Sequence, residues 1–76
     1  MGLACVLIHS KPGKASEVYE DVKSLRGVKL AFEVLGEFDV VMEYEFRNLE
    51  QLGMIIYEIA KFPGVDSTET LIETVL

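Results

Sequence analysis

The most informative part of the chain is the sequence VKLAFEVLGEFDVVMEYEF, which occupies residues 28–46. Apolar side chains alternate with other side chains along residues 28–34 and again along residues 40–46, which is typical of half-buried β-strands. The sequence GEFD at residues 36–39 interrupts this alternation. Two alternating runs joined by a short segment with glycine and aspartate predict a β-hairpin.

The residues before this hairpin predict a strand followed by a helix. Residues 3–10 are rich in aliphatic side chains and end at the turn-forming sequence KPG of residues 11–13, which predicts a strand that is apolar on both faces. Apolar side chains then recur at spacings of three and four over about residues 14–26, as on an amphipathic helix. Gly27 follows, and we expect it at the C′ position of this helix in the left-handed conformation.

The residues after the hairpin repeat this order. Residues 48–51 predict a capping box with Asn48 as the N-cap residue, and a second apolar stripe at helical spacing follows. Pro63 and Gly64 end this helix. Residues 65–76 are rich in β-branched side chains, with threonines between aliphatic residues, and predict the last strand.

An internal repeat supports this order of elements. With a shift of 37 positions, residues 25–28 (LRGV) fall on residues 62–65 (FPGV), so each half contains a strand, a helix and a strand that begins after glycine. Two such halves joined by right-handed crossovers predict an α+β, ferredoxin-like βαββαβ fold with a four-stranded antiparallel sheet. Both helices are expected on one face of the sheet, in a single domain over residues 1–76.

Composition and size predict that the chain assembles with other copies. The 76 residues are 50% hydrophobic, which excludes a disordered chain, and the net charge of −6 argues against direct contact with nucleic acid. A domain near this size buries only roughly 60% of the surface that its unfolded chain exposes. The sheet face without helices carries apolar side chains, so we expect it to be covered in a homo-oligomer.

The sequence predicts a cytoplasmic protein that does not enter a membrane. The single cysteine, Cys5, cannot form an internal disulfide, although secreted domains of this size usually need such bonds. Residues 1–3 lack the basic start of a signal peptide. The longest apolar run, residues 3–8, is far shorter than the ~20 residues that span a bilayer.

No pattern in the sequence predicts catalysis, a metal ion or a cofactor. The only histidine, His9, follows Cys5 by four residues on the same strand face, about 13 Å away, so the two do not form a catalytic pair. Spacings typical of zinc or calcium ligands are absent from the sequence. The sequence KPGK at residues 11–14 lacks the full phosphate-loop pattern and is interpreted as a turn before a helix.

The hairpin turn is the best candidate for a binding site. Gly36 permits a backbone conformation that other residues resist, and the nearby N–H groups can face an anion. Asp39 places a fixed negative charge beside them. This combination suits an amino-acid zwitterion, whose ammonium group would meet Asp39 while its carboxylate meets N–H or hydroxyl groups. The alternative is an ordinary hairpin turn, for which glycine and aspartate are common.

Hydroxyl groups at the start of the last strand are the second candidate feature. Ser67, Thr68 and Thr70 lie within four residues of one another. The alternative is structural, because threonine is a common strand residue.

Four segments, taken in order, resemble the effector-binding domain of Lrp/AsnC-type transcriptional regulators, also called the RAM domain. They are KPGK at residues 11–14, RGV at 26–28, GEFD at 36–39, and FPGV at 62–65, which leads into STET at 67–70. The resemblance covers essentially the whole chain. Its most specific parts are the G-x-x-D turn and the P-G-V-x-S/T-x-T segment.

The resemblance implies an assembly and a ligand. Members of that family dimerise through their sheets, the dimers associate into octameric rings (a tetramer of dimers) or related assemblies, and small effectors, typically amino acids, bind between dimers. The expected ligand-binding residues lie in the hairpin motif and on the last strand: Gly36, Glu37, Phe38, Asp39, Ser67, Thr68 and Thr70.

One departure from the family limits what the resemblance implies. Full-length regulators carry an N-terminal helix-turn-helix domain, whereas this chain begins at its first strand, so we expect a stand-alone, non-enzymatic effector-binding module. It would sense an amino acid or assemble with full-length Lrp/AsnC-type regulators. The alternatives are a small dimeric enzyme of the isomerase or cofactor-free monooxygenase type, which the same fold can host, and a structural partner subunit without a ligand.

Overall fold

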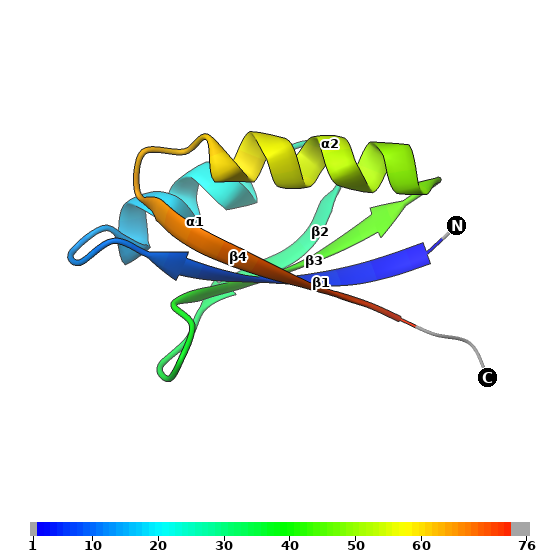
Figure 1. Cartoon of the computed structure of the whole chain (residues 1–76). Helices are drawn as coiled ribbons and strands as arrows, with labels where there is room; N and C mark the ends of the chain where they lie inside the picture. The colour runs from blue at the N-terminus through cyan, green and yellow to red at the C-terminus, as the bar shows by residue number, and fades with distance from the viewer. Residues whose placement is uncertain (1, 74–76) are drawn as a thin grey trace.

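The computed structural model describes residues 2–73 and contains one sheet and two helices (Figure 1). The elements are β1 (Gly2–Ser10), α1 (Ala15–Lys23), β2 (Val28–Glu33), β3 (Val40–Phe46), α2 (Leu49–Ala60) and β4 (Val65–Ile72). The strands are paired antiparallel in the order β2-β3-β1-β4, and both helices lie on the same side of the sheet. This arrangement confirms the predicted ferredoxin-like fold.

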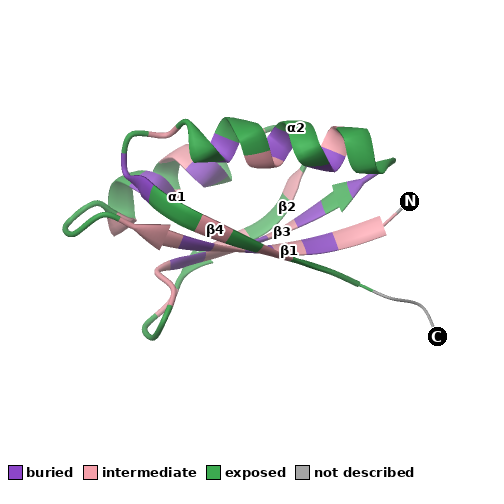
Figure 2. Ribbon diagram, viewed as in Figure 1, coloured by how far each residue is buried: buried purple, intermediate pink, exposed green. Residues whose placement is uncertain are grey.

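The hydrophobic core lies between the helices and one face of the sheet. Alternate residues of the central strands β1 and β3 are buried, as the predicted alternation requires, and buried segments recur along both strands beneath the helices (Figure 2). The helices contribute buried aliphatic side chains from their apolar stripes. The largest fully buried side chains are Ile8, Met42, Ile59, Val6, Val18, Val22 and Val40.

The second face of the sheet carries no helix, and we call it the outer face. Strand pairing assigns its residues, because directly paired residues lie on the same face. Leu3, Cys5 and Leu7 of β1 pair with Glu45, Glu43 and Val41 of β3. The outer face comprises Leu3, Cys5, Leu7, His9, Leu30, Phe32, Val41, Glu43, Glu45, Ser67, Glu69 and Leu71.

Strand β2 departs from the simple alternation of its sequence. Val28 pairs with Tyr44, but Leu30 pairs with Glu43, so the register shifts between them and Lys29 is the extra residue. Val28 therefore lies on the helix-covered face, whereas Leu30 lies on the outer face. The alternation across residues 28–30 wrongly places these two residues on the same face.

Helix α1 is shorter than the predicted range of residues 14–26. After Lys23 the chain continues in turns, in which the Leu25 N–H donates to the Val22 carbonyl and the Val28 N–H donates to the Leu25 carbonyl. Gly27 has a φ of +91°, so its predicted left-handed conformation is correct, but it lies beyond the C′ position. A Cβ there would lie 2.8 Å from Cε1 of Tyr44, which is a second reason for glycine.

The start of α2 confirms Asn48 as the N-cap residue. Oδ1 of Asn48 accepts a hydrogen bond from the Gln51 N–H at 2.8 Å. The Gln51 side chain accepts from the N–H of Arg47 at 2.7 Å, one residue earlier than in a standard capping box. The two side chains thus satisfy backbone donors on both sides of the helix start.

Strand β4 ends at Ile72. The sequence predicts a strand to residue 76, but residues 74–76 lie outside the described part of the chain. Neither of the two helices between residues 2 and 73 is long and apolar enough to cross a membrane.

Candidate functional site

The predicted hairpin turn projects from one end of the sheet (Figure 1). A hydrogen bond from the Val34 N–H to the Asp39 carbonyl, 2.9 Å long, closes the turn. Gly36 has a φ of +142°, and nothing lies within 4 Å of the place that a Cβ would occupy. The backbone conformation, rather than a close neighbour, therefore requires glycine here, and the turn at Gly36 and Glu37 is open to solvent.

Asp39 connects this turn to the end of β1. Its N–H donates to the Ile8 carbonyl at 2.9 Å, and its Oδ2 accepts a hydrogen bond from the Ser10 N–H at 2.8 Å. The carboxylate is half-buried and has a structural role that the sequence did not reveal, because its partner lies 29 residues away. This hydrogen bond uses one lone pair of Oδ2 and leaves Oδ1 as a further acceptor.

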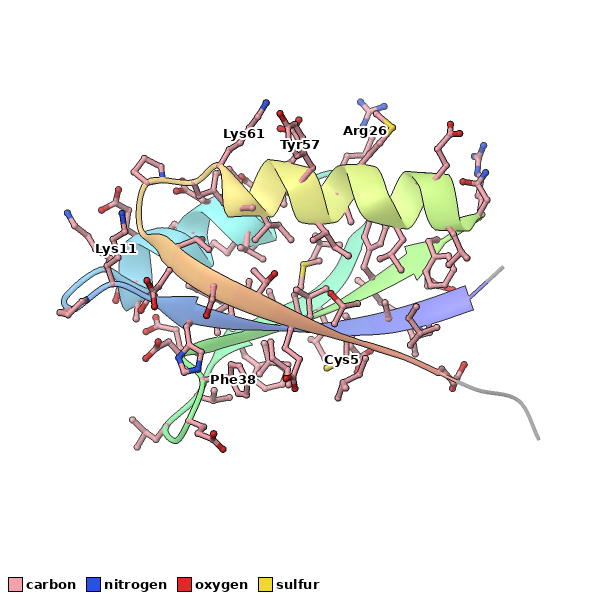
Figure 3. All side chains as sticks on the ribbon, in the orientation of Figure 1. Cys5, Lys11, Arg26, Phe38, Tyr57 and Lys61 are labelled. Carbon is pink, nitrogen blue, oxygen red and sulfur yellow. The ribbon has the colours of Figure 1, made fainter. Side chains whose placement is uncertain are left out.

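Phe38 packs against the only histidine of the chain. The rings of Phe38 and His9 have centroids 4.5 Å apart and an interplanar angle of 39°. Figure 3 shows Phe38 beneath the sheet, on the side away from the helices. His9 thus supports the hairpin turn, a role that its position in the sequence did not indicate.

Strand pairing separates the three hydroxyl residues of β4. Ser67 pairs with His9 and therefore lies on the outer face, on the same side as the His9–Phe38 contact. Thr68 and Thr70 pair with the buried residues Ile8 and Val6, so they lie on the helix-covered face. Within one chain, the structure therefore groups Phe38, Asp39 and Ser67 around the end of β1 and places the two threonines on the opposite face.

Two shallow hollows lie at the other end of the outer face. One, of about 200 Å³, is lined by Leu3, Ala4, Cys5, Leu71 and Ile72, together with Glu43 and Glu73. The other, of about 280 Å³, is lined by Gly2, Leu3, Lys29, Glu45 and Glu73. Neither hollow contains a predicted site residue, a histidine or a tyrosine.

Cys5 lies in the first hollow and is half-buried. Burial, and to a lesser extent the negative charge of Glu43 on the neighbouring strand, raise the pKa of the Cys5 thiol above its ordinary value of 9.0. The thiol is therefore protonated near neutral pH and is a poor nucleophile. Between residues 2 and 73, the structure has no group of three or more His, Cys, Asp or Glu side chains that could hold a metal ion.

Comparison with known proteins identifies the family of this chain. A family model described as the Lrp/AsnC ligand binding domain matches residues 3–74. The HTH-type transcriptional regulator FL11 of Pyrococcus abyssi is 33% identical over 70 residues, which are 92% of this chain and 46% of that protein. The chain thus spans about half the length of the curated relatives that it matches.

Solved structures agree with this match. The hypothetical protein PHS023 of Pyrococcus horikoshii is 34% identical, with a TM-score of 0.88 over 100% of this chain and 93% of that one. A transcriptional regulator of Neisseria meningitidis, solved as a complex with L-Met, shares the fold with a TM-score of 0.85 over 97% of this chain and 50% of that one, at 16% identity. The chain belongs to the Lrp/AsnC ligand-binding domain family.

Proposed function

We propose that this chain is a non-enzymatic effector-binding module that assembles through its outer face and holds an amino acid beside the hairpin turn. Membership of a ligand-binding family related to transcriptional regulators supports the effector-binding role. The amino-acid ligand, the assembly and the binding residues are the parts that we propose.

The position of the Asp39 carboxylate is the observation that supports an amino acid as the ligand. Its carboxylate is held in place by the Ser10 N–H, so the negative charge occupies a defined position beside an open glycine turn. A held carboxylate next to backbone donors matches the two charges of an amino acid. The N. meningitidis regulator, solved as a complex with L-Met, adds that a protein of this fold can hold an amino acid.

The separation of the hydroxyl residues favours a site between copies. Thr68 and Thr70 lie on the sheet face opposite to Ser67, so one chain does not direct all the predicted residues at one ligand. We infer that the hairpin turn of one dimer meets β4 of a neighbouring dimer, as in a ring formed by a tetramer of dimers. Full-length Lrp/AsnC-type regulators, which are about twice the length of this chain, are the other proposed partners.

The ligand is tested by titrating each of the twenty amino acids into the assembled protein by calorimetry. We expect at least one to bind. Asp39→Asn should weaken that binding about tenfold or more, because the amide oxygen can still accept from the Ser10 N–H while the charge that meets the ammonium is lost. Glu58→Gln, on the exposed surface of α2, removes the same charge away from the site and should leave the affinity unchanged.

Two results would contradict this proposal. If no amino acid bound at millimolar concentration, direct sensing would be wrong. If Asp39→Asn bound as tightly as the unchanged protein, Asp39 would have no role in recognising the ligand. Light scattering tests the assembly separately, and a monomer at micromolar concentration would exclude it.

A further inference from the structure

Glu43 lies in the middle of an apolar surface. Strand pairing places Leu30, Glu43, Cys5 and Leu71 in one row across the four strands of the outer face. The adjacent row contains Phe32, Val41, Leu7 and Glu69. Apolar side chains therefore flank Glu43 across the strands and at Val41, whereas Glu45 is its neighbour on the other side along β3, and we call these two rows the central rows.

The hollow beside Glu43 combines apolar walls with negative charge. Its lining combines the acidic residues Glu43 and Glu73 with the apolar residues Leu3, Ala4, Cys5, Leu71 and Ile72. A lysine or arginine side chain has the complementary form, because its aliphatic stem packs on apolar surface while its charged end pairs with a carboxylate. The volume of about 200 Å³ is sufficient for one such side chain.

The central rows contain no lysine or arginine that could supply this cation. Among the described residues, the ion pairs of the structure are Lys14–Glu17 and Lys23–Glu20, both at α1 on the helix side. Lys29 lies outside the central rows, where it lines the second hollow together with Glu45 and Glu73. A second copy whose central rows stack on these rows would therefore bring carboxylates toward carboxylates, at the spacing of about 10 Å that is usual for packed sheets.

We propose that the centre of the outer face is selective for a protein partner that presents a lysine or arginine from an apolar surface, with the cationic side chain in the hollow against Glu43 and Glu73. By the same charge, Glu43 weakens the pairing of two identical copies. This inference rests on the proposed assembly through the outer face, and it names the chemistry of the partner that this face prefers. Opposite charges across an interface determine which partner is chosen as well as how fast it binds.

A second copy that carries Glu43→Lys is a suitable probe for this preference. Position 43 lies on a central strand of the four-stranded face, so it remains near the middle of the interface in whichever direction a second copy is turned. The lysine of the probe would then meet the glutamate of the unchanged chain. The probe has the same apolar rows and differs only in the charge under test.

The experiment measures the affinities of four pairs of differently tagged copies by analytical ultracentrifugation and native mass spectrometry. We expect the unchanged chain to bind the Glu43→Lys variant about tenfold or more tightly than it binds a second unchanged chain. This difference in affinity should decrease as the salt concentration rises. Two copies of Glu43→Gln should also associate more tightly than two unchanged chains. Glu58→Lys makes the same charge change on the exposed surface of α2 and should show no preference for the unchanged chain.

Each other outcome overturns the inference. Equal affinities for all pairs would show that Glu43 does not select the partner, while the proposed assembly would stand. Weaker self-association of Glu43→Gln would show that a second copy already supplies a cation to Glu43. Monomers in every mixture would overturn both this inference and the assembly on which it rests. Circular dichroism checks the fold of Glu43→Lys, and Glu43→Gln provides the test if that variant fails to fold.

Discussion

The two faces of the sheet both carry apolar side chains, but they differ in their surroundings and in their charge. On the covered face, Ile8 and Met42 are fully buried under the helices, whereas Leu30 and Phe32 on the outer face remain 49% and 41% exposed. The covered face is uniformly apolar along β1 and β3, and the outer face mixes apolar residues with glutamates. Apolar residues on both sides of a strand therefore predict that both of its faces are buried. The glutamates show which face is buried by another molecule rather than by the helices of the same chain.

The largest effect is expected on the stability of the fold, when two neighbouring residues of β1 that lie on opposite faces of the sheet are each truncated. Ile8→Ala should lower the free energy of unfolding by about 3 kcal/mol, because Ile8 is fully buried and its removal leaves a cavity. Leu7→Ala, on the outer face, should cost much less in dilute protein, because Leu7 is only half-buried in one chain. Urea denaturation at low and high protein concentration measures both, and equal losses at low concentration would remove the distinction between the faces.

A charge on the outer face should separate the copies without unfolding them. Phe32→Glu replaces an apolar side chain that we expect at the interface, so it should reduce the molar mass measured by light scattering. The free energy of unfolding of dilute protein should change by at most about 0.5 kcal/mol, as for most surface substitutions. Tyr57→Glu, on the exposed surface of α2, is the matched control and should leave the assembly intact. An unchanged molar mass for Phe32→Glu would mean that the copies meet elsewhere.

The helix layer that covers the other face depends on the cap of α2. Asn48→Ala should cost about 1 kcal/mol of unfolding free energy, because the Gln51 N–H loses its acceptor. Asn48→Asp keeps a side-chain acceptor and should be close to the unchanged protein. Thermal and urea unfolding measure both variants, and a loss of the same size in Asn48→Asp would indicate that the cap is not the cause.

The smallest expected effect is on the reactivity of Cys5. The thiolate is the reactive form, and burial together with the charge of Glu43 raises the pKa of Cys5, so alkylation should accelerate at a higher pH than for a free cysteine. Glu43→Gln removes the second of these causes and should move the profile to lower pH. Iodoacetamide labelling followed by mass spectrometry measures the rates, and identical profiles would show that Glu43 has no influence on the thiol.

Much of the fold could be predicted because periodicity records which side chains are buried. The alternation along β3 and the stripes of both helices correspond to residues that pack in the core. The errors arise where an apolar residue packs on the core outside regular structure. Leu25 continues the helical stripe and packs against the core, but it does so from the turn after α1, and periodicity does not distinguish the two cases. The bulge at Lys29 likewise leaves no sign in the alternation.

The candidate site was less predictable because it depends on contacts between distant residues. The sequence indicated the glycine turn at residues 36–39, but the Asp39–Ser10 hydrogen bond and the His9–Phe38 contact depend on strand pairing. Because successive side chains of a strand point to opposite faces, the sequence already implied that Ser67 and Thr68 lie on opposite faces of the sheet. Whether the seven predicted residues meet one ligand remains a prediction that the calorimetric titrations test.

The strand order has a consequence for how the two halves of the chain depend on each other. Every strand pairing in the sheet, β1 with β3, β1 with β4 and β2 with β3, joins one strand–helix–strand half to the other. Neither half, taken alone, contains a ladder between its own two strands. A chain cleaved between β2 and β3 should therefore survive only as a complemented pair of fragments, and the first half of a nascent chain on the ribosome must wait for β3 before any strand ladder can form.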